Sequence, residues 1–165
     1  MFNQGRLGLT PNQKYEKSKQ PAANRWYASQ FPHRKIDRSG HCREFDLMLG
    51  NDKVEEKFIR GPAQDWLIVE LVQDIRRPTW GWFYESKCSL LIWRYCDPAG
   101  DDVIYVVSFA RLRPFVIGWL EEDPDQNMKM KNTPYSLTQN LPIPWKSLMR
   151  EGIARKFIVE GGKNG

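Results

Sequence analysis

The sequence predicts an α/β fold with the core order helix, three strands, helix and strand (αβββαβ), in which helices flank a mixed central sheet. Residues 43–59 alternate apolar and polar positions around a Gly-Asn-Asp turn, which is typical of a β-hairpin. Residues 65–73 form a continuous apolar run of strand length. The segments 21–31 and 82–96 repeat aromatic and apolar residues at helical spacing. A strand meander followed by a helical crossover gives a mixed sheet.

The first half of the chain divides into an arm, a helix and three strands. Residues 1–20 are polar with little periodicity, so we expect a flexible basic arm. Pro21 suits the first position of a helix, because a proline lacks the N–H that this position leaves unpaired. We expect the hairpin strands at 43–49 and 53–59. The run at 65–73 fits a central strand that is covered on both faces.

The second half begins with the expected helix over 82–96 and a strand over 103–109. Residues 110–120 either form a short element that ends at Pro114 or begin a helix. Residues 121–134 are polar and predict a loop. Pro144 predicts the start of a short basic helix.

Length and composition indicate one globular domain. The 165 residues include 41% hydrophobic residues and seven tryptophans, enough for a packed core. We expect an arm at 1–20, a core at 21–120, and a polar loop with a basic C-terminal extension at 121–165. No apolar run reaches the roughly 18 residues of a membrane span, and the N-terminus lacks the apolar segment of a secretory signal. Three irregularly spaced cysteines do not predict a disulfide framework. We therefore expect no membrane partner and a cytoplasmic location.

Charge is distributed unevenly along the chain, although the net value is only +5. Residues 1–40 carry eight Lys and Arg against two acidic residues, and residues 129–165 carry seven against two. Residues 41–128 carry ten against sixteen. Basic ends around an acidic centre suit a protein that binds a polyanion and holds cations. Charged ends that serve only solubility explain the pattern equally well.

The hairpin brings two carboxylates and a lysine together. Side chains alternate along a strand, so Glu55 and Lys57 share one face and Glu56 points to the other. Asp46 lies near the start of the facing strand, where its carboxylate can meet that of Glu55. Such a group can hold a divalent cation and activate a water molecule. The alternative is an ordinary ion-pair ladder on an exposed strand.

The order of these motifs resembles the PD-(D/E)XK nuclease superfamily, whose restriction-endonuclease-like core is αβββαβ. The resemblance rests on Asp46, on Glu55-x-Lys57, and on the phrases VEEKF, WLIVELVQD and GWFYESK, which are similar to phage- and mobile-element-type members. It covers about residues 21–110. The sequence departs from the motif at Phe45, where many members carry a proline.

This resemblance implies a metal-dependent nuclease that cuts DNA rather than RNA. Asp46 and Glu55 would bind Mg²⁺, which Mn²⁺ can replace, with the main-chain carbonyl of Glu56 as a further ligand. Lys57 would orient or deprotonate the attacking water, or stabilise charge on the phosphate. Glu70 lies within an apolar strand, where a carboxylate needs a partner or a metal. It is a further catalytic metal ligand, or the partner of Arg76, Arg77 or Lys57, or a side chain that points to solvent at a sheet edge.

Basic and aromatic side chains suggest nucleic-acid contacts. Lys87, near the start of the expected helix, either contacts a phosphate or is a solvated surface lysine. The basic residues expected to contact the backbone are Arg34, Lys35, Arg38, Arg43, Lys146, Arg150, Arg155 and Lys156. An aromatic cluster at Trp80, Trp82 and Phe83 either stacks on bases or belongs to the core.

Two further questions stay open at this stage. Many members of the superfamily dimerise to cut both strands, so the resemblance is also compatible with a homodimer. The alternative to an enzyme is a catalytically silent nuclease-fold module that binds nucleic acid or a partner protein. Other chemistries are disfavoured, since the chain has only two histidines and no GxxxxGK or GxSxG motif.

Overall fold

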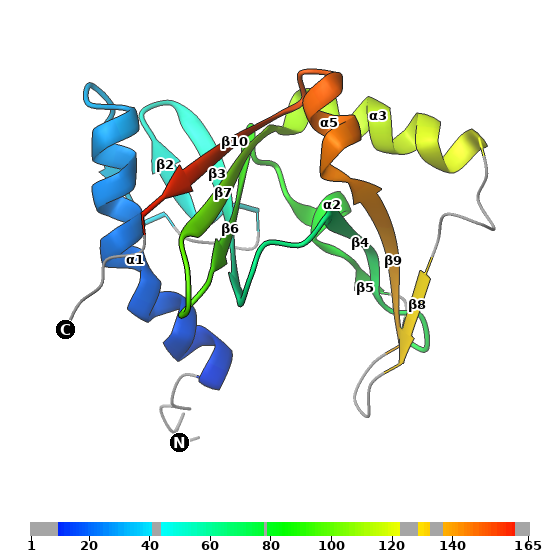
Figure 1. Ribbon diagram of the computed structural model, residues 1–165. Helices are drawn as coiled ribbons and strands as arrows, with labels where there is room; N and C mark the ends of the chain where they lie inside the picture. The colour runs from blue at the N-terminus through cyan, green and yellow to red at the C-terminus, as the bar shows by residue number, and fades with distance from the viewer. Residues whose placement is uncertain (1–9, 41–43, 78, 123–128, 133–136, 161–165) are drawn as a thin grey trace.

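Two β-sheets with associated helices make up the described part of the chain (Figure 1). The computed structural model describes residues 10–40, 44–77, 79–122, 129–132 and 137–160, with the backbone alone for 130–132. The architecture is mixed α/β, and the larger sheet is mixed in strand direction, as the sequence predicted.

The larger sheet has six strands in the order β1-β2-β3-β6-β7-β10. Its strands are β1 (Ile36–Asp37), β2 (Leu47–Leu49), β3 (Asp52–Arg60), β6 (Leu90–Cys96), β7 (Asp102–Ser108) and β10 (Ala154–Val159). Neighbours are antiparallel except for β3 and β6, which run parallel. A parallel pair needs a crossover, and here the chain between β3 and β6 passes through the second sheet.

The smaller sheet has four antiparallel strands in the order β5-β4-β9-β8. Its strands are β4 (Trp66–Asp74), β5 (Thr79–Trp80), β8 (Lys129–Asn132) and β9 (Leu137–Pro144). The helices are α1 (Pro11–Gln30), α2 (Trp82–Glu85), α3 (Phe109–Glu122) and α5 (Trp145–Arg150).

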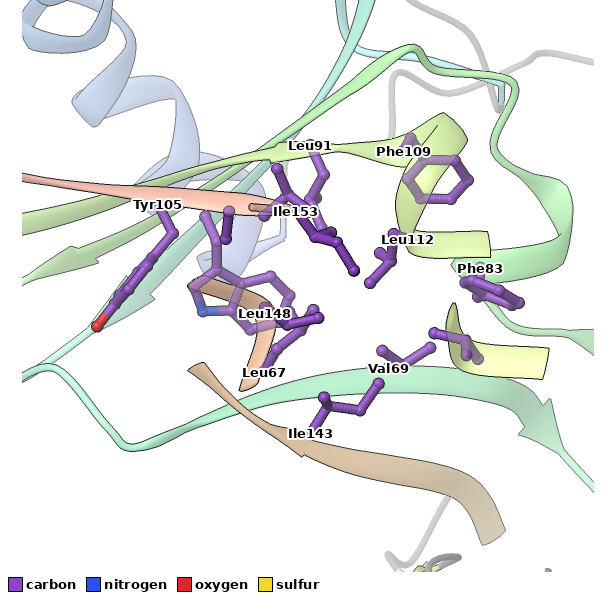
Figure 2. Close-up of a cluster of buried hydrophobic side chains, with 14 of the residues drawn as sticks. Leu67, Val69, Phe83, Leu91, Tyr105, Phe109, Leu112, Ile143, Leu148 and Ile153 are labelled. Atoms are coloured by element: carbon purple, nitrogen blue, oxygen red, sulfur yellow. The ribbon is translucent and has the colours of Figure 1, made fainter. Parts of the chain in front are cut away.

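The core is divided between the two faces of the larger sheet. On one face, α1 packs the buried side chains of Trp26 and Tyr27 against β2, β3, β6 and β7. On the other face, a larger cluster joins the sheet to β4, β9 and the other helices. Figure 2 shows Leu67, Val69 and Ile143 of the second sheet facing Leu91 and Tyr105 of the first. The rings of Tyr105 and Trp145 stack with centroids 3.8 Å apart.

The first helix begins ten residues before the predicted start at Pro21. Thr10 accepts a hydrogen bond from the N–H of Gln13, whose side chain accepts one from the N–H of Thr10, and Pro11 occupies the first turn. This capping box is a strong start signal, and it outweighs the polar composition on which the arm was predicted. Residues 11–20 therefore form the first half of α1. Residues 1–9 lie outside the described part.

The predicted helix over 82–96 is wrong. Only Trp82–Glu85 are helical, and Leu90–Cys96 form strand β6. Residues 91–96 are all buried, because α1 covers one face of β6 and the second sheet covers the other. A strand covered on both faces lacks the alternation of apolar and polar residues that identifies a half-buried strand. A chance repeat of apolar residues at helical spacing therefore led to the prediction of a helix.

The expected three-strand meander is also incorrect. The segment 65–73 forms β4, but β4 pairs with β5 and β9 in the second sheet and not with β3. Its buried residues alternate, at Leu67, Val69 and Leu71, so one face alone is fully covered. The doubly covered strand beside β3 is β6. The αβββαβ core is therefore not confirmed.

Several other predictions are confirmed. The hairpin forms as β2 and β3, with Gly50 at φ 62° in its turn. The strand at 103–109 is β7, and residues 110–120 lie in helix α3. Helix α5 follows Pro144. By contrast, the polar loop predicted at 121–134 is wrong where the structure describes it, because Glu121 and Glu122 belong to α3 and Lys129–Asn132 form β8, while the other residues of this segment lie outside the described part. Among the described residues, no helix has both the length and the apolar character required for a membrane span.

Candidate functional site

The end of the β2–β3 hairpin places Asp46 near Glu55. The ladder begins with Leu47 paired to Val54, and the main-chain N–H of Asp46 donates to the carbonyl of the same Val54 at 2.8 Å. Asp46 therefore lies just outside the regular ladder, beside residues 54–56 of β3. The charge of Glu55 acts on the Asp46 carboxylate, so the two carboxylates lie close together at the point where β2 begins.

Glu55 and Lys57 are bonded to each other on the face of β3 that looks toward the second sheet. The Lys57 Nζ lies 2.6 Å from Glu55 Oε1. The Glu55 residue is only 7% exposed, so this pair is not the exposed ion-pair ladder that was the alternative interpretation. The Lys57 Nζ also lies 5.9 Å from the centroid of the Trp82 ring, which connects the hairpin to the start of α2.

Electrostatics at the site reflect crowded negative charge. Burial, and then the neighbouring Glu55 carboxylate, raise the pKa of Asp46 to about 6. Burial lowers the pKa of Lys57, but the Glu55 and Asp46 carboxylates outweigh this effect, so that the net pKa is raised. Lys57 therefore stays protonated and partly neutralises the two carboxylates.

Glu56 points to the opposite face of β3 and anchors helix α1. Its carboxylate is buried, accepts a hydrogen bond from the Tyr27 hydroxyl at 2.7 Å, and forms an ion pair with Arg38. Arg38 also donates to the Asn24 side chain at 2.8 Å. The main-chain N–H of Glu56 donates to Asp46 Oδ2 at 2.7 Å. Glu56 thus contacts the site through its N–H, whereas the sequence prediction concerned its carbonyl oxygen.

Glu70 reaches the site from the second sheet. The expected meander placed β4 beside β3, which is wrong, yet the charge of Lys57 still acts on the Glu70 carboxylate. Burial raises the pKa of Glu70, while a hydrogen bond from the Trp82 main chain and the Lys57 charge lower it in part. A Cβ on Gly81 would lie 2.2 Å from the Glu70 carbonyl oxygen. Only glycine therefore fits here, and its lack of a side chain lets the start of α2 lie close to the backbone of Glu70.

The segment after α2 is attached to the chain just before Asp46. The N–H of Lys87 donates to the Glu44 carbonyl at 2.9 Å, and the buried Ser86 hydroxyl donates to the same carbonyl at 3.1 Å. Lys87 follows α2 in a loop, not in a longer helix, and its ammonium pairs with the Glu44 carboxylate. Its side chain is 65% exposed, so it is available to a large ligand.

Glu16 belongs to the same neighbourhood, and sequence reasoning missed it. A hollow of about 160 Å³ between α1 and the hairpin is lined by Glu16, Gln20, Arg38, Asp46, Glu56 and Phe58. The Glu16 charge also acts on Lys57. The capping box at Thr10 was the signal that could have found it, because it would have extended the helix over the site.

The predicted phosphate-contacting residues fall into three groups. Arg38 is directed inward by Glu56 and Asn24, so its role is structural. Arg34 pairs with Asp52 and Arg150 pairs with Glu151, and both remain exposed. Exposed positions without a described ion pair are Lys35, Lys146, Arg155 and Lys156. Arg43 lies outside the described residues.

Comparison of the chain with protein-family models, with curated proteins and with solved structures found no match. The site is therefore interpreted from its own geometry. Within the described residues, no group of three or more His, Cys, Asp and Glu side chains is arranged to hold a metal ion.

Proposed function

We propose that this protein is a Mg²⁺-dependent nuclease that hydrolyses phosphodiester bonds, with DNA as the preferred substrate. The observation that carries the proposal is the meeting of Asp46, Glu55 and Lys57 at one end of the β2–β3 hairpin. The Glu55 carboxylate raises the pKa of the neighbouring Asp46, and such a pair of carboxylates favours a divalent cation, because the cation removes their repulsion.

The residues present fit a magnesium ion even though no triad of acidic ligands exists among those described. Mg²⁺ keeps several waters and is commonly held by one or two carboxylates together with substrate phosphate. Asp46 and Glu55 would supply the carboxylates, with the Glu56 carbonyl as a further ligand. Glu70 is the candidate for a third carboxylate. The ion would lower the pKa of a bound water, which becomes the nucleophile.

Lys57 has the charge and position to act on the phosphate. Its ammonium is held by Glu55 and is 30% exposed, so it can also reach a ligand in front of the hairpin. Lys57 would stabilise negative charge on the scissile phosphate or orient the attacking water. Charge stabilisation requires a protonated Lys57, and the Glu55 and Asp46 carboxylates raise its pKa in the metal-free protein.

Cleavage of labelled DNA tests the proposal. Duplex, branched and single-stranded DNA are incubated with the protein in Mg²⁺, Mn²⁺ or EDTA, alongside Asp46→Asn and Lys57→Met. Two matched controls are Lys53→Met, on the same strand, and Asp97→Asn, at the far end of β6. We expect metal-dependent cleavage that both site variants lose and both controls keep. Binding without cleavage in any metal would instead favour a catalytically silent nucleic-acid-binding module.

A further inference from the structure

Two exposed aromatic rings lie beside the candidate site. Trp80 is 62% exposed and Tyr84 is 43% exposed, and their ring centroids are 5.0 Å apart in a T-shaped arrangement. Their neighbour Phe83 is buried in the core, at 1% exposure. The structure therefore separates the aromatic cluster of this segment into a packed part and a part that faces solvent.

The backbone holds this aromatic pair close to Glu70. Trp80 pairs with Val72 of β4, two residues from Glu70, and the N–H of Gly81 donates to the Leu71 carbonyl at 2.9 Å. Gly81 itself is pressed against Glu70. Trp80 precedes Gly81, and Tyr84 lies in the α2 turn that follows. The rings are thus fixed to the same short segment that connects Glu70 to Lys57.

The charge around the rings suits a polyanion. Arg76 and Arg77 lie in the turn between β4 and β5, and both are exposed. Arg76 is paired with Asp74, whereas Arg77 forms no ion pair with a described residue. On the other side of α2, the Lys87 ammonium is also exposed. Exposed aromatic rings between cations are the combination that binds single-stranded nucleic acid, since bases stack on the rings while phosphates contact the cations.

We propose that Trp80 and Tyr84 form a stacking platform for an unpaired nucleobase, so that the substrate carries a single-stranded segment next to the bond that is cut. A base within a duplex is covered by its neighbours and cannot offer its face to a protein ring. The inference rests on the proposed nuclease function for the position of the cut, but base stacking is tested by binding alone.

Binding is measured by fluorescence anisotropy in EDTA, where metal-dependent hydrolysis does not occur. The probes are a labelled DNA duplex with a single-stranded overhang and the same duplex made blunt. Wild type is compared with Trp80→Ala, Tyr84→Ala and Trp80→Phe, which keeps a ring. Trp66→Ala is the matched control, because Trp66 is 47% exposed at the opposite end of β4. These side chains are solvent-exposed, so the substitutions leave the core intact, as circular dichroism checks.

We expect wild type to prefer the overhang probe. Trp80→Ala should weaken binding of that probe about fivefold to a hundredfold, with little change for the blunt probe, which corresponds to the loss of one stacked base. Trp80→Phe and Trp66→Ala should bind like wild type. Equal affinity of wild type for both probes, or unchanged binding by Trp80→Ala, would overturn the proposal. Parallel incubation in Mg²⁺ tests cleavage separately, so loss of the nuclease function is distinguishable from loss of the platform.

Discussion

Replacing Glu56 should destabilise the protein strongly, although Glu56 is not one of the carboxylates that meet at the site. The Glu56 residue is 8% exposed. Its carboxylate accepts a hydrogen bond from the hydroxyl of the fully buried Tyr27 and forms an ion pair with Arg38. Glu56→Ala removes the acceptor of the Tyr27 hydroxyl and the ion-pair partner of Arg38, whose guanidinium keeps its hydrogen bond to Asn24. Removing one member of a buried ion pair costs about 3–5 kcal/mol. Tyr27→Phe removes a hydrogen bond to a charged group, which costs about 1.5–3 kcal/mol.

Urea-induced unfolding, followed by tryptophan fluorescence, measures these differences. The double variant Tyr27→Phe/Glu56→Ala should cost less than the sum of the single variants, because both remove the same hydrogen bond. Glu121→Ala, on the exposed end of α3, is the control and should change stability by less than about 0.5 kcal/mol. A cost below about 1 kcal/mol for Glu56→Ala, or strict additivity in the double variant, would refute the assignment of Glu56 as the anchor of α1.

The remaining predictions concern the site and its glycine. In EDTA at pH 8, Asp46→Asn should stabilise the protein by on the order of 2 kcal/mol. The pKa of Asp46 is raised from 3.8 to about 6, so the ionised carboxylate disfavours folding. The stability gained by Asp46→Asn, measured by urea unfolding, should therefore shrink as the pH falls from 6 to below 4. Lys57→Met should cost about 3 kcal/mol, because it leaves Glu55 buried beside Asp46. At acidic pH most of the lost stability should return, which thermal unfolding measures. Gly81→Ala should cost more than about 2 kcal/mol, since its Cβ meets backbone atoms of Glu70. Gly118→Ala in α3, where a Cβ meets nothing within 4 Å, should instead gain about 0.5–1 kcal/mol; equal effects of the two glycine variants would contradict the contact.

Local patterns predicted the hairpin and the proximity of Asp46, Glu55 and Lys57, because side chains alternate along a strand and a Gly-Asn-Asp turn indicates that two strands pair. They did not predict β6. Its residues are buried on both faces, so the periodicity that reveals a half-buried strand is missing. The start of α1 was readable at Thr10 and Gln13, but the prediction gave greater weight to composition than to the capping pattern.

The pairing of β4 could not have been read from its sequence. The buried residues of β4 alternate in a way that suits any sheet with one covered face, at Leu67, Val69 and Leu71. Nothing in the segment indicates which strand it pairs with. That partner, β9, lies about seventy residues further along the chain. Glu70 nonetheless reached the neighbourhood of Lys57, but by a different route: through Gly81 and Trp82 at the start of α2, not through a shared β-ladder with β3.

The site is therefore assembled from parts that no single segment holds together. Asp46 and Glu55 belong to the hairpin, Glu70 to the second sheet, and Glu16 to α1. Two contacts of Glu56 hold the hairpin part of the site in place. Its N–H donates to the Asp46 carboxylate, and its own carboxylate accepts a hydrogen bond from Tyr27 of α1. The Glu70 side depends on the close contact at Gly81 and on the attachment of Ser86 and Lys87 to Glu44. Displacing α2 should thus separate Glu70 from Lys57 while leaving Asp46 and Glu55 in place. Under the proposed function, Gly81→Ala should consequently reduce DNA cleavage but keep the stabilisation expected from Mg²⁺ on the hairpin carboxylates, whereas Asp46→Asn should abolish both. The two variants together separate the contribution of the second sheet from that of the hairpin.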